Sequence, residues 1–146
     1  MSNTNQRYNQ AMMKKFRKEL KSLLDDISEI DKIVLNKSVN SGVMVVKELT
    51  PVGQYTNGKV GGFMKKSWRA TPAYKSASGE VIKILTNSAN YSSFVNYGHR
   101  VVNRSGETVG YVKGKFMLEK AIGHIDKQLV KNFEKEVERV NREHDK

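Results

Sequence analysis

Three histidines, His99, His124 and His144, are the side chains of this chain that could exchange a proton near neutral pH. They lack a metal-site spacing such as two histidines four residues apart on one helix face. His99 is the one candidate for catalysis, because it follows an aromatic turn and precedes Arg100. A catalytic base would need an orienting carboxylate and a nucleophile within reach, and the sequence offers no distinctive pair. We therefore expect no enzymatic activity, a His99 that bonds to the backbone at the Gly98 corner, and solvated His124 and His144.

The chain contains no cysteine, which removes thiol nucleophiles, disulfides and cysteine-based zinc sites. Residues 52–62 hold four glycines, as a phosphate-binding loop would. That cradle also needs a Gly-Lys-Ser/Thr sequence that opens a helix after a strand, which is missing here. We expect no cofactor and no metal, and a flexible loop that turns at Asn57-Gly58.

The net charge is the strongest compositional feature, with 26 basic against 15 acidic side chains and a formal charge of +11. Bases concentrate in residues 1–24 and 59–83, with six bases and one acid in each. Such an excess indicates a polyanion nearby, either nucleic acid or an acidic protein surface, or only a well-dispersed surface. One alternative function is therefore a small nucleic-acid-binding module that uses the first helix together with Lys65, Lys66 and Arg69.

A length of 146 residues favours a single domain over 1–146, with frayed ends at 1–6 and 143–146. No apolar run approaches the roughly 20 residues of a membrane span, so we expect no membrane association. The polar N-terminus has no apolar core of a secretory signal.

Apolar residues from Tyr8 to Ile30 recur at intervals of three and four, which predicts an amphipathic helix over 7–30. Its polar face begins with bases and ends with acids, opposite to the preference of the helix dipole, which hints at an acidic partner. Residues 31–49 allow two interpretations. Asn40-Ser41-Gly42 between valine-rich arms suggests a hairpin, whereas the spacing of Leu35, Val39, Val43 and Val46 suggests a helix ended by Pro51.

The middle of the chain predicts strands. Residues 68–77 and 80–87 form an expected hairpin that turns at Ser78-Gly79, with Trp68 in the core rather than in a ligand site. Residues 91–98 form a short helical turn ended by Gly98, whose aromatic side chains we expect to pack. They are alternatively able to stack single-stranded nucleic acid.

An exposed basic arm over 99–113 follows, with a turn at Ser105-Gly106 and strands around Val101-Val102 and 109–112. A long amphipathic helix then runs from Gly114 to Arg142. The elements together predict an α+β fold: a small, mostly antiparallel sheet with a long N-terminal helix, a second helix and a long C-terminal helix packed on it.

Two motifs resemble those of a tailed-phage protein family that acts at the head–tail joint. The first is Thr50-Pro51-Val52-Gly53 followed by GGFMKKSW at 61–68, and the second is YSSFVNYGHR at 91–100 followed by GYVKGKFMLEKAI at 110–122. An insert over 54–60 divides the first motif, and Asn96 stands where the family often has an acidic residue.

The resemblance implies that 31–49 is a helix and that the protein is a structural component of a virion, made in the cytoplasm of a host bacterium. It implies a homo-oligomeric ring, expected to be a hexamer, at the neck or the proximal tail end, with a role in tail completion or head–tail connection. Connector or tail-tube proteins would adjoin the ring, and DNA would pass through its lumen.

Ring contacts of this kind join two different patches of the subunit, and exposed loops are suited to that role. We therefore expect the loop over 53–62 and the arm over 99–113 to supply them, through Gly53, Tyr55, Asn57, Lys59, His99, Arg100, Arg104, Glu107, Tyr111 and Lys113. The residues that carry the family motifs are Thr50, Pro51, Val52, Trp68, Tyr91, Phe94, Tyr97, Gly98, Gly114, Phe116 and Met117.

Overall fold

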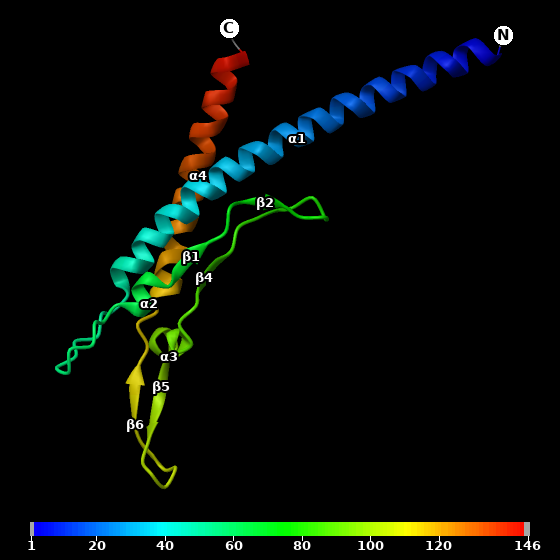
Figure 1. Ribbon diagram of the computed structural model, residues 1–146. Helices are drawn as coiled ribbons and strands as arrows, with labels where there is room; N and C mark the ends of the chain where they lie inside the picture. The colour runs from blue at the N-terminus through cyan, green and yellow to red at the C-terminus, as the bar shows by residue number, and fades with distance from the viewer. Residues whose placement is uncertain (1, 145–146) are drawn as a thin grey trace.

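The computed structural model describes residues 2–144, with the side chains of 7–143, and it has the predicted α+β architecture (Figure 1). Two long helices, α1 (Ser2–Leu49) and α4 (Met117–His144), carry three two-stranded antiparallel hairpins and two short helices between them. The ends expected to fray fall partly outside the described residues, and the single-domain organisation stays a prediction. None of the described helices is long and apolar enough to cross a membrane.

Residues 2–49 form one continuous helix, where the sequence predicted two helices over 7–30 and 31–49. The hairpin alternative for 31–49 is wrong. No glycine or proline interrupts the chain before Gly42, and that glycine is explained by packing, since a Cβ there would collide with Ile125 of α4. At 1.5 Å per residue, the 48 residues of α1 extend about 72 Å.

The core lies where the C-terminal half of α1 meets the first turns of α4. Its buried apolar side chains come from α1, α4 and the segment between them, and they are Val46, Met64, Trp68, Ala89, Met117 and Ala121. Polar contacts join the same helices, because Asn132 Nδ2 donates to Ser38 Oγ at 3.0 Å, and Ser41 Oγ lies 3.1 Å from His124 Nε2. The expectation of a solvated His124 is therefore wrong, while the side chain of His144 lies outside the described residues.

The predicted hairpin over 68–87 is confirmed, and it consists of two paired segments in succession. β1 (Trp68–Ala70) pairs with β4 (Leu85–Asn87), and beyond them β2 (Tyr74–Lys75) pairs with β3 (Val81–Ile82). The turn at its tip contains Gly79, at a φ of 92°.

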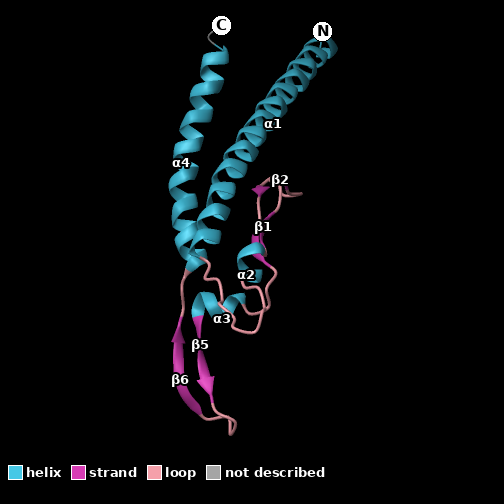
Figure 2. Ribbon diagram, turned by 60° about the vertical axis from the view of Figure 1, so that its left-hand side comes forward, coloured by secondary structure: helices cyan, strands magenta, loops and turns pink. Residues whose placement is uncertain are grey.

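The second predicted hairpin is also confirmed, as β5 (Gly98–Val102) paired with β6 (Thr108–Lys113). It follows the short helix α3 (Ser92–Tyr97), while the other short helix, α2 (Phe63–Lys66), precedes β1. Figure 2 shows α1 and α4 diverging from a common region like the arms of a V, with the β5–β6 hairpin projecting from the opposite end. The chain thus combines one small core with several extensions.

Candidate assembly surfaces

The β5–β6 hairpin, called the arm below, is held at its base by a close crossing of two glycines. Gly98 ends α3 at a φ of 84°, and a Cβ on it would collide with the carbonyl oxygen of Val112. Gly114 is equally confined, against the backbone of Asn96 and Tyr97. Both positions were singled out in the sequence as motif residues, and the structure gives the reason: only a residue without a side chain lets the two backbones approach this closely.

Asn96 connects the base of the arm to the beginning of α4. Its Oδ1 accepts from the backbone N–H of Leu118 at 3.1 Å, and its Nδ2 donates to both carboxylate oxygens of Glu119 at 2.9 and 3.2 Å. Partial burial acts to raise the pKa of Glu119, but hydrogen bonds from Asn96, its own backbone and Tyr97 outweigh burial and lower it. Sequence reasoning missed this role, although the departure from the acidic family residue at 96 was a signal.

The tip of the arm is an ordered turn built by Asn103. Its Oδ1 accepts from the backbone N–H groups of Ser105 and Glu107, both at 2.9 Å, and its Nδ2 donates to the Glu107 carboxylate at 2.8 Å. Gly106 has a φ of 83°, as the Ser105-Gly106 turn signal implied. The side chains proposed for contacts on the arm are all exposed: His99, Arg100, Arg104, Glu107, Tyr111 and Lys113.

Aromatic side chains gather around the base of the arm but do not enter the core. Tyr91, Phe94 and Tyr97 are 41%, 56% and 58% exposed, and Phe94 meets the His99 ring edge-on at 5.9 Å between centroids. The packing expected for these three residues is therefore absent within one chain, and Val95 is the residue of this turn that packs against the core. These three side chains together form an apolar surface that no other described part of the chain buries.

His99 lies at the Gly98 corner, close to the backbone, as the sequence predicted. Its Nδ1 lies 3.4 Å from the carbonyl oxygen of Phe94, a distance that permits a hydrogen bond to the backbone at the Gly98 corner. No group of three or more histidine and acidic side chains is placed to hold a metal ion within the described residues.

The loop over 53–62 forms the second projecting surface and extends away from the core at the lower left of Figure 1. Its two limbs approach so closely that a Cβ on Gly61 would collide with the carbonyl oxygen of Gly53. Tyr55 is 57% exposed and Val60 87%. Asn57 and Lys59 are also exposed, and Gly58 has a φ of 77° at the predicted turn.

The Thr-Pro-Val motif divides between core and surface. Trp68 is buried and donates from Nε1 to Thr50 Oγ1 at 2.8 Å, and Thr50 in turn donates to the carbonyl oxygen of Val46. This confirms Trp68 as a core residue. Pro51 and Val52 are exposed at the start of the loop.

The return of the arm to the core is divided in the same way. Met117 is fully buried, whereas Phe116, at a φ of 50°, is 42% exposed. Met117 therefore anchors this end of the arm to the core.

The N-terminal half of α1 carries a third surface, which the sequence assigned to the interior. Every side chain of its apolar stripe is exposed, by between 43% and 66%. The stripe consists of Tyr8, Met12, Met13, Phe16, Leu20, Leu23, Leu24 and Ile27. The predicted spacing of the stripe is correct. The stripe does not pack on the sheet of its own chain, as the predicted fold required. Burial begins only at Ser28, because the N-terminal half of α1 extends away from the point where α4 crosses it (Figure 1).

Comparison with known protein families identifies the family of this chain. Residues 14–98 match the family described as "Bacteriophage HK97-gp10, putative tail-component", over more than half of the chain. The chain belongs to this family. Membership supports a structural role in a phage virion, as a tail component that meets other virion proteins. Comparisons with curated proteins and with solved structures gave no match.

The matched range ends at Gly98, so it includes residues 14–49 of α1, both halves of the first motif and the aromatic turn. The arm itself and α4 lie beyond it.

Proposed function

We propose that this family member is a ring-forming structural subunit, expected to be a hexamer, at the head–tail neck or at the proximal end of the tail. In this role it completes the tail or connects it to the head, and it catalyses no reaction. Adjoining connector or tail-tube proteins are its partners, and DNA passes through the lumen of the ring.

The observation that carries the proposal is the arm with its aromatic base. The arm projects from a small core, and Tyr91, Phe94 and Tyr97 are exposed on the surface around its base. Aromatic side chains of this kind are enriched in the buried centres of protein interfaces. Tyr111, 81% exposed on the arm, extends the same chemistry outward. Assembly by shape and apolar contact accounts for this surface better than solvation does.

Shortening the arm tests the proposal. Replacing 101–110 by a two-residue turn removes the projecting half and keeps the glycine crossing at 98 and 114. We expect a folded protein with a normal circular dichroism spectrum that fails to enter tails, so that particles lack a functional neck.

The matched control shortens the other exposed hairpin by removing its Ser78-Gly79 tip. The control is expected to assemble. Fully infective particles from the arm-shortened variant would refute the proposal.

A further inference from the structure

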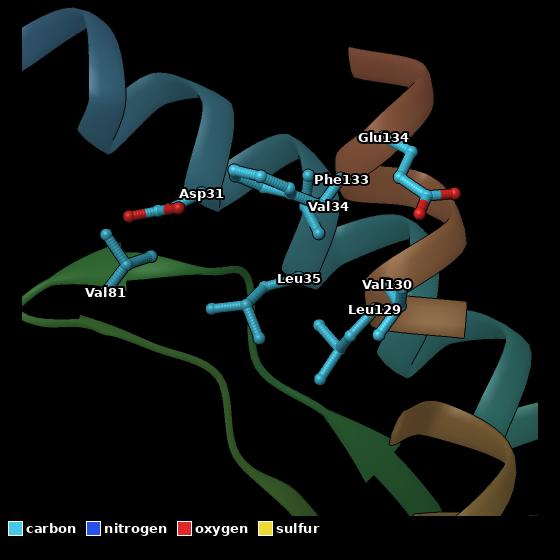
Figure 3. A pocket seen from close by; sticks show the side chains of 8 residues that line it. All are labelled: Asp31, Val34, Leu35, Val81, Leu129, Val130, Phe133 and Glu134. Carbon is cyan, nitrogen blue, oxygen red and sulfur yellow. The ribbon is translucent and has the colours of Figure 1, made fainter. Parts of the chain in front are cut away.

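The exposed stripe of α1 has a counterpart elsewhere on the same molecule. An apolar groove of about 620 Å³ lies where α1, α4 and β3 meet. Its apolar lining comes from all three elements and consists of Val34, Leu35, Val81, Leu129, Val130 and Phe133 (Figure 3). Val130 and Phe133 are 63% and 49% exposed, so the groove is open in a single chain.

Charge distinguishes the groove from the other uncovered surfaces. Asp31 of α1 and Glu134 of α4 lie on its two sides, with the apolar side chains between them (Figure 3). Among the described residues neither carboxylate has an ion-pair partner. A partner of the groove should therefore be apolar along its middle and basic along both edges.

The N-terminal half of α1 has this composition. Lys15 and Arg17 are the neighbours of Phe16 in the sequence, so each lies about 100° around the helix from it, one on each side of the stripe. Glu19 is the one acid in residues 7–24 and is paired with Lys15 at 4.0 Å, a weak contact at the surface. The helix is thus apolar in the centre, basic on its flanks and uncovered.

The same chain cannot join these two surfaces. Leu20 precedes Asp31 by 11 residues of one straight helix, which places it about 16 Å farther along the axis from the groove. Contact requires a second molecule.

We propose that the stripe of α1, centred on Phe16 and Leu20, docks into the α1–α4–β3 groove of a second copy of this chain. Lys15 and Arg17 meet Asp31 and Glu134 of that copy. The contact is heterologous, since each molecule offers one helix and one groove, and such contacts propagate around a ring or along a chain of subunits. The inference rests on the proposed function for its ring and adds the surface that links neighbours.

An antiparallel pairing of two α1 helices is the competing arrangement, since Tyr8 would face Ile27 and Phe16 would face Leu20. Such pairing is isologous and stops at a dimer. It would also leave the groove and its two carboxylates unoccupied. The observations favour the groove, and the two arrangements differ in an experiment.

The absence of native cysteine makes disulfide trapping specific. Leu20→Cys and Val130→Cys are made as two single variants of different mass and mixed under mild oxidation. We expect the mixed disulfide dimer to form, and the double variant L20C/V130C to form a ladder of linked subunits. A disulfide within one chain is excluded, because the two Cα atoms must come within about 7 Å. Lys14→Cys, on the opposite face of the helix, replaces L20C in the control and is expected to give no link to V130C.

Charge reversal gives a second measurement that does not use cysteine in the stripe. Lys15→Glu with Arg17→Glu is expected to abolish self-association in sedimentation, and mixing with an Asp31→Lys, Glu134→Lys variant is expected to restore it. Disulfide dimers between the Phe16→Cys and Leu20→Cys variants, without any link to V130C, would establish the antiparallel pair and overturn the inference. So would the absence of any link.

The outcomes separate this inference from the proposed function. If no disulfide forms between L20C and V130C, but shortening the arm still prevents particle assembly, the α1 docking alone is overturned. A full ladder together with infective arm-shortened particles would overturn the neck role and leave the docking in place.

Discussion

At the scale of single residues, the geometry of the arm depends on one backbone conformation. Gly98 adopts a φ of 84°, and its α-carbon faces the carbonyl oxygen of Val112 with no room for a side chain. Gly98→Ala combines an unfavourable φ with a steric collision, and each such strain costs about 1–3 kcal/mol. We expect the free energy of unfolding, measured by urea denaturation, to fall by at least this amount and particle assembly to weaken.

Gly110→Ala is the matched control for that variant, because Gly110 lies in the same hairpin with open space around it and no positive φ. Its unfolding free energy should change by less than about 0.5 kcal/mol. Equal losses in the two variants would contradict the role assigned to the glycine crossing.

Glu136 is the one buried acid among the described residues, and its environment makes stability depend on pH. Hydrogen bonds from Arg139 lower the pKa of Glu136 first of all, against a smaller raising effect of burial, and the charges of Arg139 and Lys37 add to the lowering. Arg139 Nη2 lies 2.7 Å from the carboxylate. A lowered folded-state pKa stabilises the fold above the ordinary pKa of about 4.5, and this is lost as pH falls through the lowered value.

The free energy of unfolding of the native protein should therefore fall as the pH drops from about 5 through the lowered pKa of Glu136. Glu136→Gln should be less stable at pH 7 and should show a weaker decline over that range. Glu138→Gln, at an exposed position of the same helix, should leave the profile unchanged. Chemical unfolding at several pH values measures both, and parallel profiles for native protein and E136Q would disprove the assignment.

At the scale of elements, Asn96 is the joint between α3 and α4. Asn96→Asp keeps the acceptor for Leu118 N–H but replaces the amide donor by a carboxylate that faces Glu119. We expect a loss of about 1–3 kcal/mol at pH 7, since a charge-assisted hydrogen bond is replaced by repulsion. The loss should shrink near pH 4, where carboxylates begin to accept protons. Asn90→Asp, at an exposed position, is the control, and a pH-independent loss in N96D would exclude repulsion as its cause.

The elements also show how far local sequence signals reach. The hairpin turning at Ser78-Gly79, the arm with its Ser105-Gly106 turn and the α+β class were predictable because turn residues and apolar period are local properties. The continuity of α1 was not, since Asn36, Ser38 and Gly42 are weak helix formers. Tertiary contacts outweigh that weakness: Asn36 Oδ1 accepts from Lys83 Nζ and from the backbone of Ala73, and Ser38 accepts from Asn132.

The spacing of apolar residues predicts which face of an element is apolar, but it does not predict which element or molecule packs against that face. The stripe from Tyr8 to Ile27 and the aromatic turn at 91–97 both have the spacing of buried surfaces, and both are exposed in one chain. Their cover comes from outside the chain if assembly is the function, which a single sequence cannot specify. For the same reason the contacts proposed for the loop over 53–62 stay a prediction.

At the scale of the whole molecule, the net charge of +11 is organised with respect to the apolar stripe. Lys14, Lys18 and Lys21 lie on the face of α1 opposite Phe16, so docking of the stripe would leave them outward. In the proposed ring they would then be free to meet DNA phosphates or an acidic protein surface. This arrangement separates the subunit contact from the electrostatic one within a single helix.

Changing the outward face should therefore alter DNA contact and leave assembly intact. Each phosphate contact contributes a slope of about −0.9 to the dependence of log K on log salt, so replacing Lys14, Lys18 and Lys21 by Gln should reduce the slope by up to about three. Retention of duplex DNA should fall steeply between about 50 and 200 mM salt in the native protein. Lys127, Lys131 and Lys135 of α4, also exposed, provide a control triple with the same change of charge. If the two triple variants lose DNA equally, net charge alone governs the contact; if only the α1 triple loses it while L20C/V130C trapping persists in that background, the basic face and the docking stripe are separate surfaces of one helix.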